Sequence, residues 1–155
     1  MKIRDMMNTA PTTVSPGDSL KTLLCIQNAR QSRLLHVVDE HGKLLGVISS
    51  FDLLKLMIPF YLDANLAKAM SDASFLPKRA YDDNKDKTAA DLMLKDFSAV
   101  SPDDFFLEAE TLIARKGFNA LPVVDENGKL VGEIGRREVL LHVIRQCDCC
   151  REEDA

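Results

Sequence analysis

The sequence predicts an α+β fold built from two copies of one unit, because the chain repeats itself and each copy alternates strand and helix patterns. When the 155-residue chain is shifted by 86 positions against itself, 18 of the 54 positions from Asp5 to Ile58 meet an identical residue without a gap. Self-similarity at a fixed spacing is typical of a duplicated structural unit. We therefore expect two copies of one fold.

Each copy reads as strand, helix, strand, strand, helix. The segments Val14-Ser15-Pro16 and Val100-Ser101-Pro102 open the two copies. Asp18 and Asp104 follow at positions where an N-cap residue would start the first helix. The apolar residues between 106 and 113 recur with helical spacing and predict one buried helix face.

A hairpin and a second helix complete each copy. Two short apolar segments, 34–38 and 44–48, flank the turn sequence DEHG, and DENG takes its place in the second copy. This pattern predicts two antiparallel strands. A helical apolar stripe follows in each copy, and Pro59 ends the first one.

Residues 59–87 have no counterpart elsewhere in the chain. The stretch from Leu62 to Met70 predicts a short helix, and the charged run 82–87 predicts a solvated linker. The expected domain boundaries are therefore 2–58 for the first copy, 59–87 for the intervening segment, 88–144 for the second copy and 145–155 for a cysteine-rich acidic tail.

Charge, hydrophobicity and cysteine positions exclude several classes of function for this protein. The net charge of −4 argues against nucleic acid or an anionic membrane as the main partner. The apolar stretches are far shorter than a membrane span. The first residues, MKIRDMMNT, lack a signal-peptide pattern, and the cysteines are not spread through the repeat, so we expect a protein of the reducing cytoplasm.

Two stretches give the repeat a family resemblance: LPVVDENGKLVG at Leu121–Gly132, and GVISSFD at Gly46–Asp52, where a strand meets a helix. The unit resembles the CBS (cystathionine β-synthase) domain, and two units resemble a tandem CBS pair. The resemblance implies two βαββα half-modules related by a pseudo-twofold axis, with strands packed centrally and helices outside.

The binding frame of that family is a glycine, two residues, Thr or Ser, two residues, then Asp. Gly46, Ser49 and Asp52 match it, whereas Gly135 and Glu138 replace the polar pair in the second copy. A hydroxyl beside free backbone N–H groups favours phosphate, and a carboxylate accepts strong hydrogen bonds from ribose hydroxyls. The same Ser-x-x-Asp spacing is also a capping box that only satisfies the helix start.

The resemblance implies that each cleft between the copies takes sugar-side groups from one copy and base-side groups from the other. For the main nucleotide cleft it implies Ser49, Asp52, Arg33, Ile48, Ser98, Asn119 and Ala120. For a weaker second cleft it implies Thr12, Arg136, Arg137 and Glu138. A solvated helix face is the alternative explanation for the paired arginines.

Two further features have alternative readings. His36 takes the place of Pro122 and reads as a packed strand histidine, because no nucleophile and carboxylate accompany it. Cys147, Cys149 and Cys150 offer thiolate ligands for zinc or copper. One crowded cluster is an unusual metal site, so incidental thiols in a frayed tail are the alternative, and we expect no metal.

The leading hypothesis is a non-catalytic regulatory sensor. It binds an adenosine-type ligand, namely AMP, ADP, ATP or S-adenosylmethionine, needs no cofactor, and passes its occupancy to a separately encoded effector protein. We expect a homodimer, because Leu53, Met57, Val139 and Val143 would otherwise form an exposed apolar patch. The alternatives are a ligand-free structural or adaptor module, and a metal or thiol sensor acting through the cysteine cluster. No catalytic set can be assembled, so an enzyme is not expected.

Overall fold

The computed structural model describes residues 1–70 and 75–147, which divide into two compact units. The first-copy unit contains Thr12–Val37 and Gly46–Lys95. The second-copy unit contains Met1–Pro11, Val38–Leu45 and the chain from Asp96 onward. Each unit thus includes the leading segment of the other copy: 1–11 belongs to the second-copy unit, and the start of the second repeat, up to Lys95, belongs to the first-copy unit.

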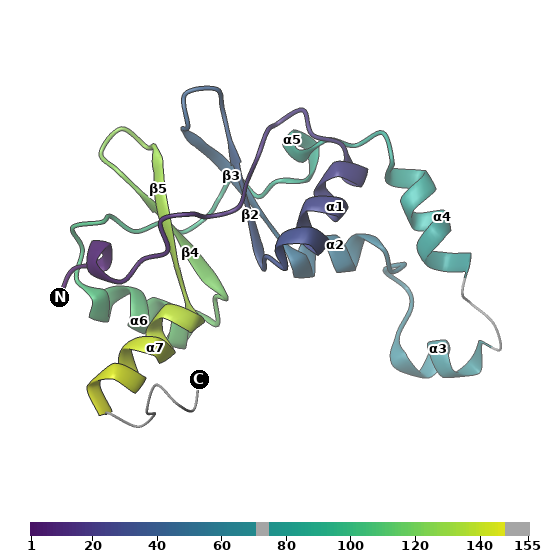
Figure 1. Cartoon of the computed structure of the whole chain (residues 1–155). Coiled ribbons are helices and arrows are strands. Elements are labelled where there is room, and N and C mark those ends of the chain that lie inside the picture. The colour runs from purple at the N-terminus through teal and green to yellow at the C-terminus, as the bar shows by residue number, and fades with distance from the viewer. Residues whose placement is uncertain (71–74, 148–155) are drawn as a thin grey trace. The chain divides into compact units, whose positions relative to one another are not determined.

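The first-copy unit forms a three-stranded sheet and five helices in the described residues (Figure 1). In chain order they are β1 (Thr13–Val14), α1 (Leu20–Arg30), β2 (Leu34–Val38), β3 (Leu44–Ser49), α2 (Ser50–Leu56), α3 (Ala64–Ala69), α4 (Phe75–Asn84) and α5 (Ala89–Leu92). The sheet order is β1-β2-β3, and β1 runs parallel to β2 with Thr13 opposite His36. The predicted strands 34–38 and 44–48 are confirmed.

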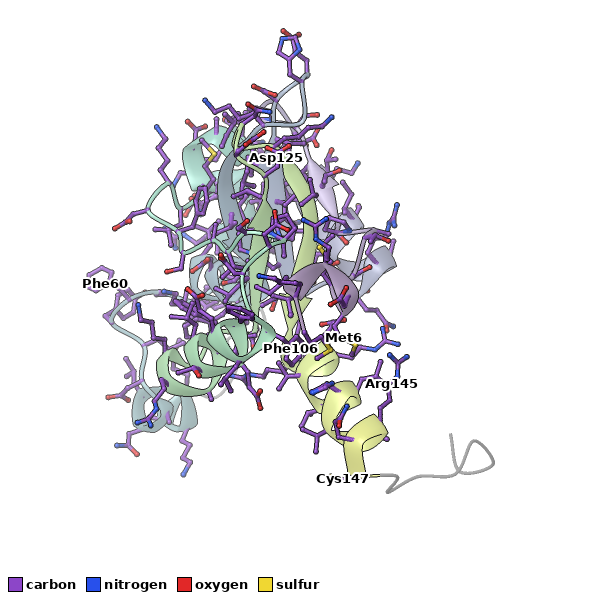
Figure 2. The ribbon with its side chains drawn as sticks, turned by 90° about the vertical axis from the view of Figure 1, so that its left-hand side faces the viewer. Met6, Phe60, Phe106, Asp125, Arg145 and Cys147 are labelled. Atoms are coloured by element: carbon purple, nitrogen blue, oxygen red, sulfur yellow. The ribbon has the colours of Figure 1, made fainter. Side chains whose placement is uncertain are left out.

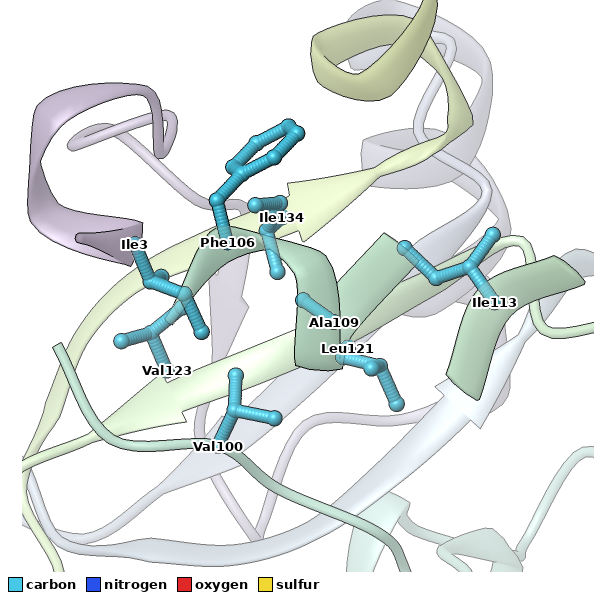
Figure 3. Close-up of a cluster of buried hydrophobic side chains, with 8 residues drawn as sticks. All are labelled: Ile3, Val100, Phe106, Ala109, Ile113, Leu121, Val123 and Ile134. Atoms are coloured by element: carbon cyan, nitrogen blue, oxygen red, sulfur yellow. The ribbon is translucent and has the colours of Figure 1, made fainter. Parts of the chain in front are cut away.

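The second-copy unit forms a two-stranded antiparallel sheet packed against two helices (Figure 1). Its elements are η1 (Ile3–Asp5), α6 (Phe106–Lys116), β4 (Ala120–Val124), β5 (Leu130–Gly135) and α7 (Arg136–Cys147). Ala120 pairs with Gly135 at one end of the β4–β5 ladder. Its core contains Ile3, Val100, Phe106, Ala109, Ile113, Leu121, Val123 and Ile134 (Figure 3). The apolar face predicted for 106–113 is therefore the buried face of α6, and the α+β class is confirmed.

The exchanged leading segments pair with the second strand of each hairpin. In the second-copy unit, Asn8 and Glu133 exchange backbone hydrogen bonds of 2.8 and 2.9 Å. In the first-copy unit, Val47 and Leu94 do the same at 3.1 and 2.8 Å. Each leading segment thus continues the sheet of the unit that it joins, and this satisfies backbone groups at the strand edge.

Close packing explains the glycine that opens both frames. A Cβ atom at Gly46 would lie 2.7 Å from the Met93 sulfur, and one at Gly132 would lie 2.8 Å from both the Met7 sulfur and the Asn8 carbonyl oxygen. No side chain fits where the leading segment crosses the strand. The shared glycine therefore has a packing role in each unit.

Asp18 and Asp104 do not cap the first helices, contrary to the sequence-based prediction. The Asp18 carboxylate accepts from Ser15 N at 2.9 Å and that of Asp104 from Ser101 N at 2.8 Å, so both close the turn before the helix. Ser19 is the N-cap of α1, accepting from Thr22 N, and α6 has no side-chain cap. The reason is local, because an aspartate three residues after a serine can accept a hydrogen bond from the backbone N–H of that serine. The carboxylate is then not available to the N–H groups of the helix start.

The segment 59–87 is more helical than predicted. α3 confirms a helix within 62–70, but α4 includes Asp82 and Asp83, so the prediction of a linker over the whole charged run is wrong. Pro77 lies in the first turn of α4, where its missing N–H costs nothing. In the second copy the expected first strand is reduced to a bridge between Val100 and Val123.

Candidate functional site

The Ser49 and Asp52 pair lies at the start of α2 and forms a capping box. Ser49 Oγ accepts from Asp52 N at 3.0 Å, and Asp52 Oδ2 accepts from Ser49 N at 3.0 Å. The structural reading of this spacing is therefore confirmed. The capping box does not use all the hydrogen-bonding groups of the pair. The Ser49 hydroxyl can still donate its proton, and the Asp52 carboxylate has a second oxygen that can accept.

Asp52 also lines a pocket of the first-copy unit. The Asp52 side chain is 42% exposed, and its Oδ1 lies 3.8 Å from Lys55 Nζ. The pocket has a volume of about 450 Å³ and is lined by Ile48, Asp52, Leu53, Lys55, Leu56, Asp91, Leu92, Met93 and Leu94. Its volume falls in the range of small-molecule sites. Mostly apolar walls with a few charged groups suit a ligand that has both an apolar ring and hydroxyl groups.

Sequence reasoning missed the far wall of this pocket. Asp91, Met93 and Leu94 come from α5 and the segment after it, which the exchange of leading segments brings beside β3. A hydrogen bond from Thr88 N, at 2.9 Å, lowers the pKa of Asp91, so this carboxyl group is charged near neutral pH. The only signal in the sequence was the position of these residues at the start of the second repeat.

Arg33 and Asn119 hold equivalent positions in the two copies. Arg33 O accepts from Ser50 N at 3.0 Å, and Asn119 O accepts from Arg136 N at 3.2 Å, so each carbonyl receives a hydrogen bond from the start of the following helix. The Arg33 side chain is exposed, in the first-copy unit that also contains Ser49, Asp52 and the buried Ile48. An exposed guanidinium is available to an anionic group.

The residues predicted for the base side belong to the second-copy unit. Ser98, Asn119 and Ala120 are all half-buried there. A Cβ atom at Gly135 would lie 2.9 Å from Asn119 O and 3.3 Å from Ala120 Cβ. This crowding explains why the second frame has glycine at the place of Ser49.

The polar side chains of the second frame are engaged within their own unit. Glu138 Oε2 accepts from Gly135 N at 2.9 Å, so the longer side chain makes the same helix-start bond as Asp52. Arg136 Nε donates to Phe118 O at 3.1 Å and its Nη2 to Gly117 O at 2.9 Å. Arg136 therefore closes the end of α6, whereas Arg137 is exposed.

His36 and Thr12 form a buried contact in the first-copy unit. His36 has no exposed surface, and both its backbone N and its Nδ1 lie 3.0 Å from Thr12 O. Burial lowers the pKa of His36 despite that hydrogen bond, so the ring is neutral at pH 7. The reading of His36 as a packed strand histidine fits this environment.

The cysteine cluster lies mostly outside the described residues. Cys147 is exposed at the end of α7, while Cys149 and Cys150 are beyond the part of the chain that the structure describes. Within residues 1–70 and 75–147, no group of three His, Cys, Asp or Glu side chains could hold a metal ion. Over the same residues, no helix is long and apolar enough to cross a membrane.

Two copies of one unit and a glycine frame at each strand-to-helix junction define a duplicated module with a polar pair in one frame. The sequence matches the CBS domain family over residues 3–59 and again over residues 89–145, and the chain belongs to this family.

Known proteins are similar to this chain in sequence. The chain is 30% identical over 140 residues to an A-adding tRNA nucleotidyltransferase of Aquifex aeolicus, covering 90% of this chain and 14% of that protein. It spans 43% of an uncharacterised Methanocaldococcus jannaschii protein, at 26% identity. The chain therefore spans less than half the length of these relatives.

Two crystal structures have the same fold. CBSX2 of Arabidopsis thaliana, in complex with AMP, superposes with a TM-score of 0.73 at 24% identity, covering 94% of this chain and 98% of the other. The CBS domain pair of the protein MJ0100, in complex with 5′-methylthioadenosine and S-adenosyl-L-methionine, gives 0.69 at 19% identity, with 94% and 98% covered.

Proposed function

We propose that this chain is a non-catalytic regulatory module that binds one class of ligand, adenosine derivatives. The observation that carries the proposal is the Asp52 carboxylate, half-exposed in a pocket at the one frame that keeps the polar pair of the family. The complexes of CBSX2 with AMP and of MJ0100 with 5′-methylthioadenosine and S-adenosylmethionine support this class of ligand.

Each polar residue of the frame has a role. Asp52 accepts hydrogen bonds from the two ribose hydroxyls, and a charged acceptor makes such bonds strong. The Ser49 hydroxyl, which already accepts from Asp52 N, donates its proton to the 5′ substituent, and the exposed Arg33 adds charge attraction for a phosphate there.

Regulation follows when a ligand binds one conformation of the chain better than another. The bound ligand then changes a surface that a separately encoded effector protein reads. We also propose a homodimer. The apolar side chains available for it are Leu54, Ile58, Leu140 and Val143, whereas Leu53, which the sequence placed in the exposed stripe, is buried with 4% exposure.

A second candidate is a ligand-free adaptor module. The observation that favours it is the complete capping box, because Ser49 and Asp52 already satisfy each other without a ligand. In that case the pocket beside Asp52 stays filled with water, and the exposed helix faces alone carry the function.

Purified protein distinguishes the two candidates. Acid release followed by absorbance at 260 nm detects co-purified nucleotide, and calorimetric titration with AMP and with S-adenosylmethionine measures binding directly. The regulatory proposal predicts a saturable heat with at least one of the two. If neither ligand binds nucleotide-free protein up to about 1 mM, corresponding to about −4 kcal/mol, the adaptor function replaces it.

A further inference from the structure

The first helices of the two copies begin differently, and the fold does not require the difference. Ser19 is the N-cap of α1, and its hydroxyl accepts from Thr22 N at 3.3 Å. Phe105 holds the equivalent position before α6 and makes no side-chain cap bond. Serine is among the most favourable N-cap residues and apolar residues are among the least favourable. The start of α6 therefore lacks a capping hydrogen bond that the same fold makes in the first copy.

The apolar side chains at the start of α6 are exposed. Phe105 is 62% exposed and Leu107 is 70% exposed, whereas the first copy has Ser19 and Lys21 at these two positions. Because both copies have the same fold, the first copy shows that polar residues are sufficient there. Neighbouring exposed apolar side chains that the fold does not need are typical of an interaction surface.

Phe105 and Leu107 line a groove of the second-copy unit. The groove has a volume of about 700 Å³, and its lining comes from Met1, from residues 105–108 and 110–112, and from His142 of α7. The ring of Phe106, which is buried, lies 4.9 Å from the His142 imidazole between centroids, so α6 and α7 are in contact there. This α6 groove is therefore a mostly apolar depression supported by two packed helices.

The charges at the α6 groove favour a cationic occupant. The acidic side chains that line it are Glu108, which is exposed, and Glu110, which is half-buried. The Phe105 ring already accepts one ammonium group, because Lys2 Nζ lies 4.0 Å from its centroid. Carboxylates and an aromatic face both attract lysine and arginine side chains. The groove therefore suits a segment that carries apolar and basic side chains together.

Building on the regulatory function above, in which a separately encoded effector protein reads the chain, we propose that the α6 groove docks a basic amphipathic helix of that effector. The apolar face of the helix packs against Phe105 and Leu107, and its basic side chains pair with Glu108 and Glu110. This role explains the missing cap, because binding a partner and stabilising the free chain make different demands on residue 105.

A labelled peptide and two matched double variants test this inference. The probe is a fluorescein-labelled peptide of about 15 residues with leucine on one helix face and lysine on the other, and fluorescence anisotropy measures its binding. Phe105→Ser with Leu107→Gln keeps the net charge and should weaken binding by about tenfold or more. Phe51→Ser with Leu54→Gln changes the same two residue types, also exposed, in the first-copy unit and should change binding by less than about threefold.

The charge of the groove is tested separately. Glu108→Gln with Glu110→Gln should weaken binding of the lysine peptide, more at low salt than at high salt, and a peptide with glutamate in place of lysine should not bind. Equal losses in the Phe105 and Phe51 double variants would overturn the inference, as would no binding of the lysine peptide by the parent up to about 100 µM. If light scattering shows that the Phe105 double variant converts a parental dimer to a monomer, the occupant is a second copy and the effector helix is excluded.

Two further measurements separate the docking surface from folding and from ligand binding. Phe105→Ser alone should keep the melting temperature or raise it by about 2–4 °C, because serine can cap α6 as Ser19 caps α1. A fall of more than about 5 °C would make Phe105 a packing residue and contradict the inference. The parent is also titrated with AMP and S-adenosylmethionine. If only the peptide binds, the adenosine-binding function fails and the docking surface stands, and if only an adenosine ligand binds, the docking inference alone fails.

Discussion

The carboxyl group of Glu133 links the stability of the fold to pH. Glu133 is half-buried on β5, where the first copy has Val47, and its backbone pairs with Asn8. Burial, and next the charge of Glu138, raise the pKa of Glu133 to about 7. A raised pKa in the folded state means that folding favours the protonated form.

The sign of the effect follows from that shift. The stabilising contribution of protonated Glu133 is complete below its ordinary pKa of 4.5 and is lost as the pH rises through about 7. We expect Glu133→Gln to raise the free energy of unfolding by about 1–3 kcal/mol at pH 7.5 and by much less at pH 4.5. Urea denaturation at both pH values measures it. An equal change at the two pH values would rule out the titration of Glu133 as the cause.

Other single residues show what the sequence could and could not predict. The Ser49 and Asp52 pair follows from local spacing, and the structure has it as a capping box. The hydrogen-bond partner of Asp18 could not be predicted from spacing alone, because its carboxylate can accept either from the N–H groups of the helix start or from Ser15 N. The reason for glycine at position 135 could not be predicted from the sequence. The close approach of Gly135 to Asn119 O in the fold explains why the second copy has no serine hydroxyl there.

At the scale of elements, α6 and α7 are joined by one arginine. Gly117 ends α6 in the left-handed conformation, with φ of 70°, and Arg136 from the start of α7 donates to Gly117 O and Phe118 O. These carbonyls lie where a helix ends and lacks internal partners. Arg136, which the family resemblance implied for a weaker second cleft, therefore has a structural role at a helix end.

We expect Arg136→Met to lower the free energy of unfolding by about 1–3 kcal/mol, because it removes two hydrogen bonds from a charged donor while keeping an apolar stem. Arg137→Met is the matched control, since Arg137 is exposed on the same helix and should change stability by less than about 0.5 kcal/mol. Chemical denaturation compares the two. Equal losses would mean that Arg136 does not stabilise the end of α6.

The elements themselves were predictable to different degrees. Strands β2 and β3 follow from apolar runs on either side of a turn, and both are present. α4 was hidden by its charged end, although Leu76, Ala80 and Tyr81 recur with helical spacing and are half-buried. A run of charged residues can therefore be part of a helix when its charged side chains lie on the solvent-exposed face.

At the scale of the whole molecule, the duplication was readable but the exchange of leading segments was not. Local patterns identify a strand, but they do not say which sheet edge it joins. Asn8 therefore pairs with Glu133 and Leu94 with Val47, each across the boundary between repeats in the sequence. This exchange also brings Met93 and Leu94 to the pocket beside Asp52.

Exposed apolar side chains lead to a prediction of assembly. Leu54 on α2 is 55% exposed and Leu140 on α7 is 62% exposed, and Phe60 is fully exposed (Figure 2). Apolar surface of this kind favours self-association. Light scattering should give a mass of twice 17.3 kDa. Replacing Leu54 and Leu140 together by Glu should shift it towards one chain, and a parent that stays monomeric at about 100 µM would contradict the dimer.

Calorimetric titration of two matched variants tests the central claim that Asp52 binds the ribose of an adenosine ligand. Asp52→Asn keeps an oxygen for the Ser49 N–H but loses the charge, and Glu138→Gln makes the same change in the second frame. With whichever of AMP or S-adenosylmethionine binds the parent, we expect Asp52→Asn to weaken binding by about ten- to hundredfold, from about 1.5–3 kcal/mol of charge-assisted hydrogen bonding, and Glu138→Gln to change it by less than about threefold. Equal losses in the two variants, or parental affinity in folded Asp52→Asn, would contradict the account.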